Sequence, residues 1–493
     1  MTTGDGRPAP RNAASILALA AILGVFVLLR LPLLSVGAAP RGWNGDASIF
    51  GLMAKKIHDG EGFDVFYWGQ NYMGPLTSAL AAGLRRAFLD PAGFGAEAGP
   101  IALRLAILVE LAVGSAFFVA GLARLFGQTV ALGTGLALAL GPPHLIRLAA
   151  GERPGPEMAF ALGSFLFWLA ADALSRPQAV LDRPAGRFVF GLVAGIGWWM
   201  NQTIVFVLVP AASVALLRPG PRRIRVVAPL LAGFVLGYAP VWMGRVFGWY
   251  EIHLGSPVPP LWLSSLPARL PRFLGADAWR FFGLDGVLPA PLLALAALVF
   301  VTLLLSWRPW SGGVVFVAAI AGIGAAVSFL AEIDPAGDRY LTPALPSAIA
   351  LVLVVAAEAE ARLRRRIPAA VSLLVSVGLA LFAAYSLSAR ARATVEGLLS
   401  EPDRRGPLRA IGEGGYTVCH AGYDRAYTLQ FLSDESVQFI PFHGPDRNRA
   451  LSARLRAEPG PQCLVTDDGA VRPWLPSDAA QEGGPARRRA EKR

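Results

Sequence analysis

The apolar residues of this chain come in long runs that are separated by short polar stretches. Many runs hold about 20 residues, the length at which a helix crosses the hydrocarbon core of a bilayer. A helix satisfies its backbone hydrogen bonds internally, so runs of this kind are helical in lipid. The expected spans, about eleven by this length criterion, are 14–34, 101–122, 129–146, 158–174, two short helices within 188–217, 226–243, 287–305, 314–330, 340–357 and 367–387. The pattern predicts a polytopic α-helical membrane protein.

Composition agrees with this fold class and limits the partners. The chain is 54% hydrophobic and 16% charged, whereas a soluble protein carries about 25% charged residues. Its net charge of +11 comes almost entirely from arginine. The arginines fall mostly between apolar runs, where cytoplasmic loops and anionic lipid headgroups explain them. We therefore expect membrane lipids as partners, and no nucleic acid.

Arginine placement also predicts the topology. Arg7 and Arg11 precede the first span, and the clusters at 218–225 and 362–366 fall on the same side of the membrane under the eleven-span assignment. The positive-inside rule puts this side, with the N-terminus, in the cytoplasm. The first apolar run lacks a small-residue cleavage site and is expected to remain as an anchor. An odd number of spans places the C-terminal part outside the cytoplasm.

The C-terminal part has a different pattern, in which short apolar strands alternate with helices. Strands are expected at 416–421, 437–442 and 462–467, with helices at 424–433 and 448–458 between them, and this alternation predicts a small parallel sheet. A disulfide between Cys419 and Cys463 is feasible if the first and third strands adjoin. We expect three domains: a membrane domain at 1–388 with a large outer loop at 35–100, an extracytoplasmic α/β domain at 389–475, and a disordered basic tail at 476–493.

The first outer loop concentrates acids, bases and aromatic residues in a chain otherwise dominated by Leu, Ala, Val and Gly. Residues 47–58 are expected to form an amphipathic helix in the membrane interface, and 72–89 a second interfacial helix or a short span. Asp46, flanked by Gly45 and Ala47, is the leading candidate for a general base. The competing interpretation is that Asp46 caps the helix that starts at Ala47. The two roles are compatible.

Three further sets of charged residues are candidates for the same site. Arg339, at the outer end of the tenth span, suits a lipid phosphate, unless it only pairs with Asp338 and headgroups. Lys55 and Lys56 would bind the same phosphate, or only hold an amphipathic helix on the membrane. Glu157 is a candidate second carboxylate, hydroxyl-orienting group or metal ligand, or an acid that only stabilises a helix N-terminus.

An aromatic and amide run completes the candidate site. Aromatic faces combined with amide and hydroxyl groups suit sugar recognition, although an interfacial aromatic belt has the same composition. The residues concerned are Tyr67, Trp68, Gln70, Asn71 and Tyr72. The sequence has no DxD pair of acids and no histidine-rich cluster, so we expect neither a metal nor a cofactor.

Three short motifs carry a resemblance to a known family. The segments FYWGQNYMG (66–74), GWWMNQT (197–203) and DRYLTPALP (338–346), together with an Asp in the first outer loop, resemble the GT-C superfamily of membrane glycosyltransferases. That superfamily includes protein O-mannosyltransferases, the aminoarabinose transferases that modify lipid A, and bacterial glycosyltransferase family 39-like proteins. The resemblance covers residues 14–388, and the C-terminal α/β domain is less standard for the family.

The resemblance implies a glycosyltransferase of the bacterial inner membrane. Its donor would be a sugar on a polyprenyl phosphate, its acceptor an envelope lipid, glycan or protein, and its reaction an inversion at the anomeric carbon. Asp46 matches the catalytic Asp of the family. Ala47 replaces the second acid of the common pair, which leaves Glu157 as the substitute, and Arg339 would take the lipid phosphate.

Two other function classes remain as alternatives. A lipid or polysaccharide transporter or flippase predicts charged residues inside the spans and repeat symmetry, and neither is clear in the sequence. A non-catalytic membrane protein of envelope assembly would use the loops only to shape a lipid groove.

Overall fold

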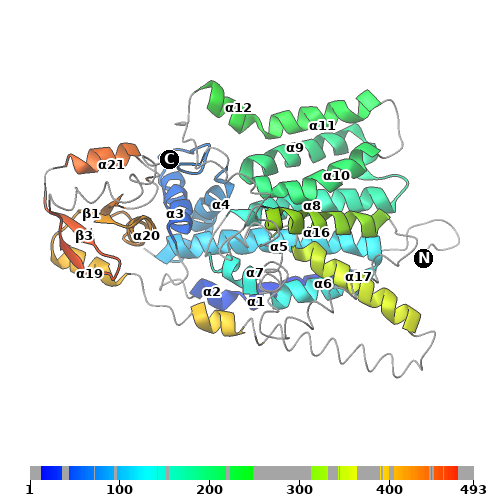
Figure 1. Cartoon of the computed structure of the whole chain (residues 1–493), viewed down its shortest axis with the longest axis horizontal. Coiled ribbons are helices and arrows are strands. Elements are labelled where there is room, and N and C mark those ends of the chain that lie inside the picture. The colour runs from blue at the N-terminus through cyan, green and yellow to red at the C-terminus, as the bar shows by residue number, and fades with distance from the viewer. Residues whose placement is uncertain are drawn as a thin grey trace.

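The protein is described here by a computed structural model (Figure 1). It describes residues 13–35, 44–70, 73–93, 97–141, 143–151, 155–217, 223–247, 312–330, 342, 345–363, 389, 392–398, 405–442, 446, 449–458 and 460–475. Two of the expected spans, 287–305 and 367–387, lie outside these residues. A bundle of long helices occupies one part of the molecule, and a small sheet with its own helices lies at one end of the long axis (Figure 1).

Every named element in the described part of the chain up to residue 363 is a helix. In order they are α1 (Ala13–Leu28), α2 (Leu31–Ser35), α3 (Gly45–His58), α4 (Leu76–Leu84) with a π-helical turn at Arg85–Leu89, α5 (Ala98–Phe126), α6 (Gln128–Leu140), α7 (Pro143–Ala149), α8 (Pro156–Ser175), α9 (Pro184–Met200), α10 (Val205–Leu217), α11 (Arg223–Gly237), α12 (Ala239–Val246), α16 (Gly312–Leu330) and α17 (Leu345–Leu363). Two described helices, α5 and α8, are long and apolar enough to cross a membrane. Shorter apolar segments of 10–17 residues lie in α6, α10, α11, α16 and α17 and at 19–34.

Helices α9 and α11 lie side by side through closely spaced glycines (Figure 1). A Cβ atom added at Gly195 would lie 2.3 Å from the backbone oxygen of Phe234, and one added at Gly191 would lie 2.0 Å from that of Leu230. Gly233 and Gly237 of α11 approach the backbone of α9 in the same way. Small residues four apart let two helix backbones touch, which is a common packing mode in membranes.

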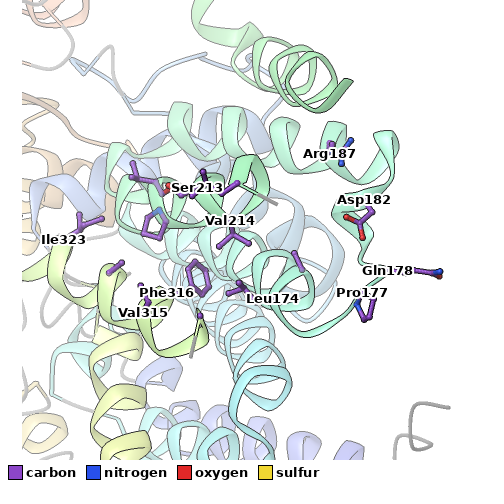
Figure 2. A pocket seen from close by; sticks show the side chains of 16 residues that line it. Leu174, Pro177, Gln178, Asp182, Arg187, Ser213, Val214, Val315, Phe316 and Ile323 are labelled. Atoms are coloured by element: carbon purple, nitrogen blue, oxygen red, sulfur yellow. The ribbon is translucent and has the colours of Figure 1, made fainter. Parts of the chain in front are cut away.

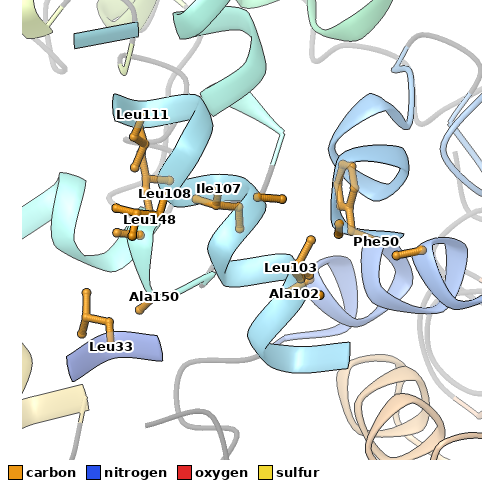
Figure 3. Packing of buried hydrophobic residues seen from close by; sticks show 14 of the residues in the cluster. Leu33, Phe50, Ala102, Leu103, Ile107, Leu108, Leu111, Leu148 and Ala150 are labelled. Carbon is orange, nitrogen blue, oxygen red and sulfur yellow. The ribbon is translucent and has the colours of Figure 1, made fainter. Parts of the chain in front are cut away.

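Helix α5 forms the centre of the largest hydrophobic cluster (Figure 3). Leu103, Ile107 and Leu111 lie at the helical spacing of one face and are buried against residues of α3, α7 and α2. In Figure 3, Phe50 of α3 and Leu148 of α7 lie on opposite sides of α5. The helix of the first outer loop is therefore part of the core rather than an amphipathic helix on a surface.

Buried charges inside α5 correct the sequence analysis, which saw no clear charges within the spans. Arg104 and Glu110 are both buried. Arg104 donates from Nε to the carbonyl oxygen of Ala150 (2.9 Å) and from Nη1 to that of Leu33 (3.2 Å). A buried guanidinium requires such acceptors, so Arg104 ties α5 to the ends of α2 and α7.

The C-terminal residues form a four-stranded sheet in the order β2-β1-β3-β4. Its elements are α19 (Gly406–Glu413), β1 (Val418–Ala421), α20 (Tyr423–Leu432), β2 (Gln438–Pro441), α21 (Arg449–Arg456), β3 (Gln462–Val465) and β4 (Val471–Pro473). The three expected strands are present and β1 is parallel to both neighbours, whereas the unexpected β4 is antiparallel to β3. Because β1 and β3 adjoin with Cys419 opposite Cys463, these cysteines form a disulfide. We call the described residues between 405 and 475 the C-terminal unit.

The C-terminal unit packs on the first outer loop through α20, which lies beside α3 (Figure 1). The buried ring of Phe431 fits over Gly51, where an added Cβ would come within 2.4 Å of the ring. Ser48 Oγ donates to Thr428 Oγ1 (3.2 Å) in the same buried interface. At its rim, Arg405 pairs with Glu97 at 2.6 Å.

Candidate functional site

Asp46 lies in the first turn of α3, and a neighbouring residue caps the helix. The side chain of Asn44 accepts a hydrogen bond from the backbone N–H of Ala47 (2.9 Å), which makes Asn44 the N-cap. The helix therefore starts at Gly45 instead of Ala47, and the interpretation of Asp46 as the cap is wrong. Asn is as good a cap as Asp, so the sequence GWNGD allowed either choice.

Two tyrosine hydroxyl groups meet at the carboxylate of Asp46. Tyr423 donates to Oδ1 at 2.7 Å, and Tyr67 lies 3.3 Å from the same oxygen and 3.2 Å from the backbone oxygen of Asp46. The Tyr67 side chain is buried, and its ring lies 4.8 Å from that of Phe50, one turn along α3 from Asp46. The structure thus brings together Asp46 and Tyr67 of the predicted site, and it adds Tyr423.

Tyr423 comes from the C-terminal unit, nearly four hundred residues away in sequence. It is the first residue of α20 and directly follows β1 and Gly422. The next residue, Asp424, accepts a hydrogen bond from the backbone N–H of Gly45 through Oδ1 (2.9 Å). The start of α20 therefore contacts the start of α3. Sequence reasoning missed both residues, although their place at the carboxyl end of a parallel strand, where open α/β sheets carry their functional groups, was a usable signal.

Lys55 and Lys56 lie at the other end of α3 from Asp46. Nine residues at a rise of about 1.5 Å separate Asp46 from Lys55 by about 14 Å along the helix axis. Lys55 pairs with Asp59 (2.6 Å) and with Glu435 of the C-terminal unit (3.6 Å). Partial burial lowers the pKa of Lys55, but the hydrogen bond to Asp59 and the nearby acids outweigh it, so that the pKa is raised overall. Lys56 pairs with Asp64 (2.8 Å).

The aromatic run divides between the two ends of α3. Trp68 donates from Nε1 to Asp64 (2.7 Å), beside Lys56, whereas Tyr67 contacts Asp46. Gln70 closes a turn by donating its backbone N–H to the carbonyl oxygen of Tyr67 (2.9 Å). Asn71 and Tyr72, like Arg339, lie outside the described residues.

Glu157 is fully buried in the first turn of α8. Its Oε2 accepts a hydrogen bond from the backbone N–H of Gly155 (2.7 Å). A Cβ added at Gly155 would lie 3.9 Å from the ring of Phe50, so this turn lies against α3. The structure therefore buries this acid at the start of α8, two residues after a glycine that lies near Phe50 of α3.

One cavity of the described residues adjoins the contacts of Asp46. It has a volume of about 650 Å³ and lies at the carboxyl ends of β1 and β3. Tyr423, Asp424 and Thr428 line it on one side, and Asp467 and Asp468 on the other. No group of three or more His, Cys, Asp or Glu side chains that would hold a metal ion occurs within the part of the chain that the structure describes.

A larger cavity of about 920 Å³ lies between α8, α10 and α16 (Figure 2). Its lining is mostly apolar, with Leu174, Val214 and Phe316 facing it, and Asp182 and Arg187 mark one end (Figure 2). Leu174 is separated from Glu157 by nearly the whole length of α8, about 25 Å. We assign no chemistry to this groove, because it is remote from Asp46 and poor in polar groups.

Comparisons with known proteins point to one fold. No protein-family model matches the sequence, and no curated protein matches it. Among solved structures, the apo structure of ArnT from Cupriavidus metallidurans matches with a TM-score of 0.57 at 13% identity, over 90% of this chain and 93% of ArnT.

The oligosaccharyltransferase of Archaeoglobus fulgidus matches in two complexes. With a tethered acceptor peptide the TM-score is 0.54, and with an inhibitory peptide and dolichol-phosphate it is 0.52, both at 12% identity over 87% of this chain. This chain spans 64% of the length of the oligosaccharyltransferase in each case. At such identities the likeness concerns the fold. The chain shares the overall fold of ArnT and of this oligosaccharyltransferase.

Proposed function

We propose that this chain transfers a sugar from a polyprenyl-phosphate carrier to a hydroxyl group of an envelope lipid, glycan or protein. The observation that carries the proposal is the position of Asp46: a carboxylate at the start of α3, oriented by Tyr423 and Tyr67, in a chain with the GT-C fold. The reaction takes place on the outer face of the bacterial inner membrane, with the N-terminus of the chain in the cytoplasm and the C-terminal unit outside.

In the proposed mechanism Asp46 is the general base. The acceptor oxygen forms a bond to the anomeric carbon while the bond from that carbon to the phosphate oxygen breaks, and the electron pair leaves with the lipid phosphate. Asp46 takes the acceptor proton, and the configuration of the anomeric carbon inverts. Phosphate is already a good leaving group, so positioning and charge stabilisation supply most of the rate.

Arg339, which lies outside the described residues, is proposed from its charge and from the resemblance to bind the departing phosphate. Lys55 and Lys56 are weaker candidates for this role, since each already pairs with an acid at the far end of α3. The segment 67–72 contacts the sugar, and Glu157 is retained as the second carboxylate.

The test is the variant Asp46→Asn in the purified full-length chain in lipid nanodiscs. The substrates are a panel of undecaprenyl-phosphate hexoses and pentoses, with envelope extract as acceptor, and the readout is released undecaprenyl phosphate. General base catalysis contributes about 10²- to 10⁴-fold, so we expect a rate loss of that size with unchanged thermal stability. Wild-type turnover by Asp46→Asn would refute the role of Asp46, and inactivity of the wild type on every donor would refute the function.

A transporter remains the second candidate, because α5 carries the buried charges Arg104 and Glu110, a feature of transport pathways. Against it, Arg104 is engaged with the backbone carbonyls of Ala150 and Leu33, which is a structural role. Movement of the labelled lipid-linked sugar across a vesicle membrane without its consumption would favour transport.

A further inference from the structure

We propose that the C-terminal unit completes the catalytic centre, with Tyr423 as a positioning residue for Asp46. The inference rests on the proposed function, because it assigns Asp46 the role of general base. It goes beyond that function by giving the C-terminal unit a part in the reaction that neither the sequence nor the resemblance supplies.

The geometry of the contact is the first argument. The hydroxyl of Tyr423 lies 2.7 Å from Asp46 Oδ1, the usual length of a strong hydrogen bond between oxygens, whereas that of Tyr67 lies at 3.3 Å, which is long for this type of bond. Two hydroxyl groups at one carboxylate oxygen restrict rotation of the side chain. The short contact from Tyr423 therefore contributes most to the orientation of the carboxylate.

The fold holds Tyr423 in place for this contact. It begins α20 directly after β1, a central strand that pairs with both β2 and β3 and is joined to β3 by a disulfide. Its ring lies 5.3 Å from that of Tyr427 in an edge-to-face arrangement. A Cβ atom added at Gly45 would lie 2.8 Å from Tyr423 Cε1. Only a glycine before Asp46 lets the tyrosine come this close.

The interface does not depend on the Tyr423 hydroxyl alone. Phe431 over Gly51 and the Ser48–Thr428 hydrogen bond hold α20 on α3 at other points, and the Arg405–Glu97 ion pair joins the C-terminal unit to the residue before α5. Removal of one hydroxyl should thus leave the unit docked. A loss of rate without loss of docking is the signature of positioning, because a purely structural role would alter both.

The experiment compares Tyr423→Phe with the matched control Tyr427→Phe, which removes a phenol hydroxyl from the same helix one turn later. Rates are measured with the full-length chain in nanodiscs on the undecaprenyl-phosphate sugar that the wild type uses best. Docking is measured in each background as the yield of a disulfide between Ser48→Cys and Thr428→Cys, whose wild-type hydroxyl groups lie 3.2 Å apart.

We expect Tyr423→Phe to lower kcat by about 10- to 100-fold, the effect of one hydrogen bond to a charged group. Its KM and its cross-linking yield should be unchanged, and Tyr427→Phe should have a kcat near that of the wild type. Wild-type kcat in Tyr423→Phe would overturn the inference, as would a loss of cross-linking in parallel with activity or an equal loss in Tyr427→Phe. These outcomes are separate from the test of the function: an inactive Asp46→Asn beside a fully active Tyr423→Phe leaves the function standing and removes only the role of the tyrosine.

Discussion

The two ends of α3 differ in the kind of contact that holds them. At the N-terminal end, Asp46 receives a hydrogen bond from the hydroxyl of Tyr423 and lies against the buried Tyr67. At the C-terminal end, Lys55 and Lys56 form ion pairs with acids whose side chains are about one-third exposed, Asp59 (33%) and Asp64 (32%). Partly exposed ion pairs contribute little to stability, whereas hydrogen bonds to a charged group in a packed interface are strong and directional.

The difference indicates which part of a charge-rich loop is the better candidate for a functional site. Charge density alone favoured the lysine end, which holds most of the acids and bases of the loop. Convergence of segments distant in sequence favours the aspartate end, where α3, the turn at Tyr67 and α20 meet. The predictions below test whether the two ends are as different as the contacts indicate.

Gly51→Leu should have the largest effect, because its side chain would occupy the position of the Phe431 ring. Overpacking of this kind costs about 1–3 kcal/mol, and relief requires α20 to move away from α3. We expect near-complete loss of transfer together with loss of the Ser48→Cys/Thr428→Cys cross-link. The control is Gly83→Leu in α4, where an added Cβ has nothing within 4 Å. Retained docking in Gly51→Leu would show that the close contact of Phe431 with Gly51 is not needed to hold α20 on α3.

Tyr67→Phe should have an intermediate effect. The phenylalanine ring keeps its place beside Phe50, while the two long contacts of the hydroxyl to the carboxylate and backbone oxygens of Asp46 are lost. Because these contacts are long, we expect them to contribute less than the short bond from Tyr423, about 0.5–1.5 kcal/mol, and kcat to fall by about 2- to 10-fold. A loss greater than that of Tyr423→Phe would reverse the order that the two distances predict.

Lys56→Gln should have a small effect on both rate and stability. Its partner Asp64 is partly exposed, and removal of such a pair changes the free energy of unfolding by about 1 kcal/mol or less. We expect the KM for the lipid-linked donor to change by less than about threefold on the same grounds. A tenfold rise in KM in Lys56→Gln, or in the companion variant Lys55→Gln, would instead indicate that the lysine end binds the phosphate of the donor.

Acid should weaken the contacts at the lysine end of α3. Burial raises the pKa of Asp59, but hydrogen bonds from Lys55 and His58 outweigh it, so that its pKa is lowered overall. An acid with a lowered pKa in the folded state stabilises the fold above its unfolded pKa of about 3.9, and this stabilisation is lost as pH falls through the folded value. We expect hydrogen exchange at the C-terminal turn of α3 to rise below about pH 4. Asp59→Asn should weaken this dependence without removing it, because Asp90 still contacts His58.

The resemblance implied the GT-C fold, which the structural neighbours bear out, and the pattern of apolar runs supported a helical membrane protein. Strand and helix periods in the C-terminal region likewise located β1, α20, β2, α21 and β3 to within a few residues. The helical membrane pattern and the C-terminal elements both rest on periodicity, which is a local property of the chain. The identity of the helix cap at Asn44 was not accessible in the same way, because Asn44 and Asp46 are equally good caps and only packing chose between them.

The sequence by itself determined that this is a helical membrane chain with an α/β C-terminal region and a chemically dense first loop that contains Asp46. Only the tertiary structure decided which groups meet at Asp46: it brought in Tyr423, left Lys55 and Lys56 at the far end of α3, and buried Glu157 in the first turn of α8. The physical reason is that periodicity reports which face of an element is apolar, whereas a site forms from the ends of elements, and their meeting depends on how whole helices and sheets pack.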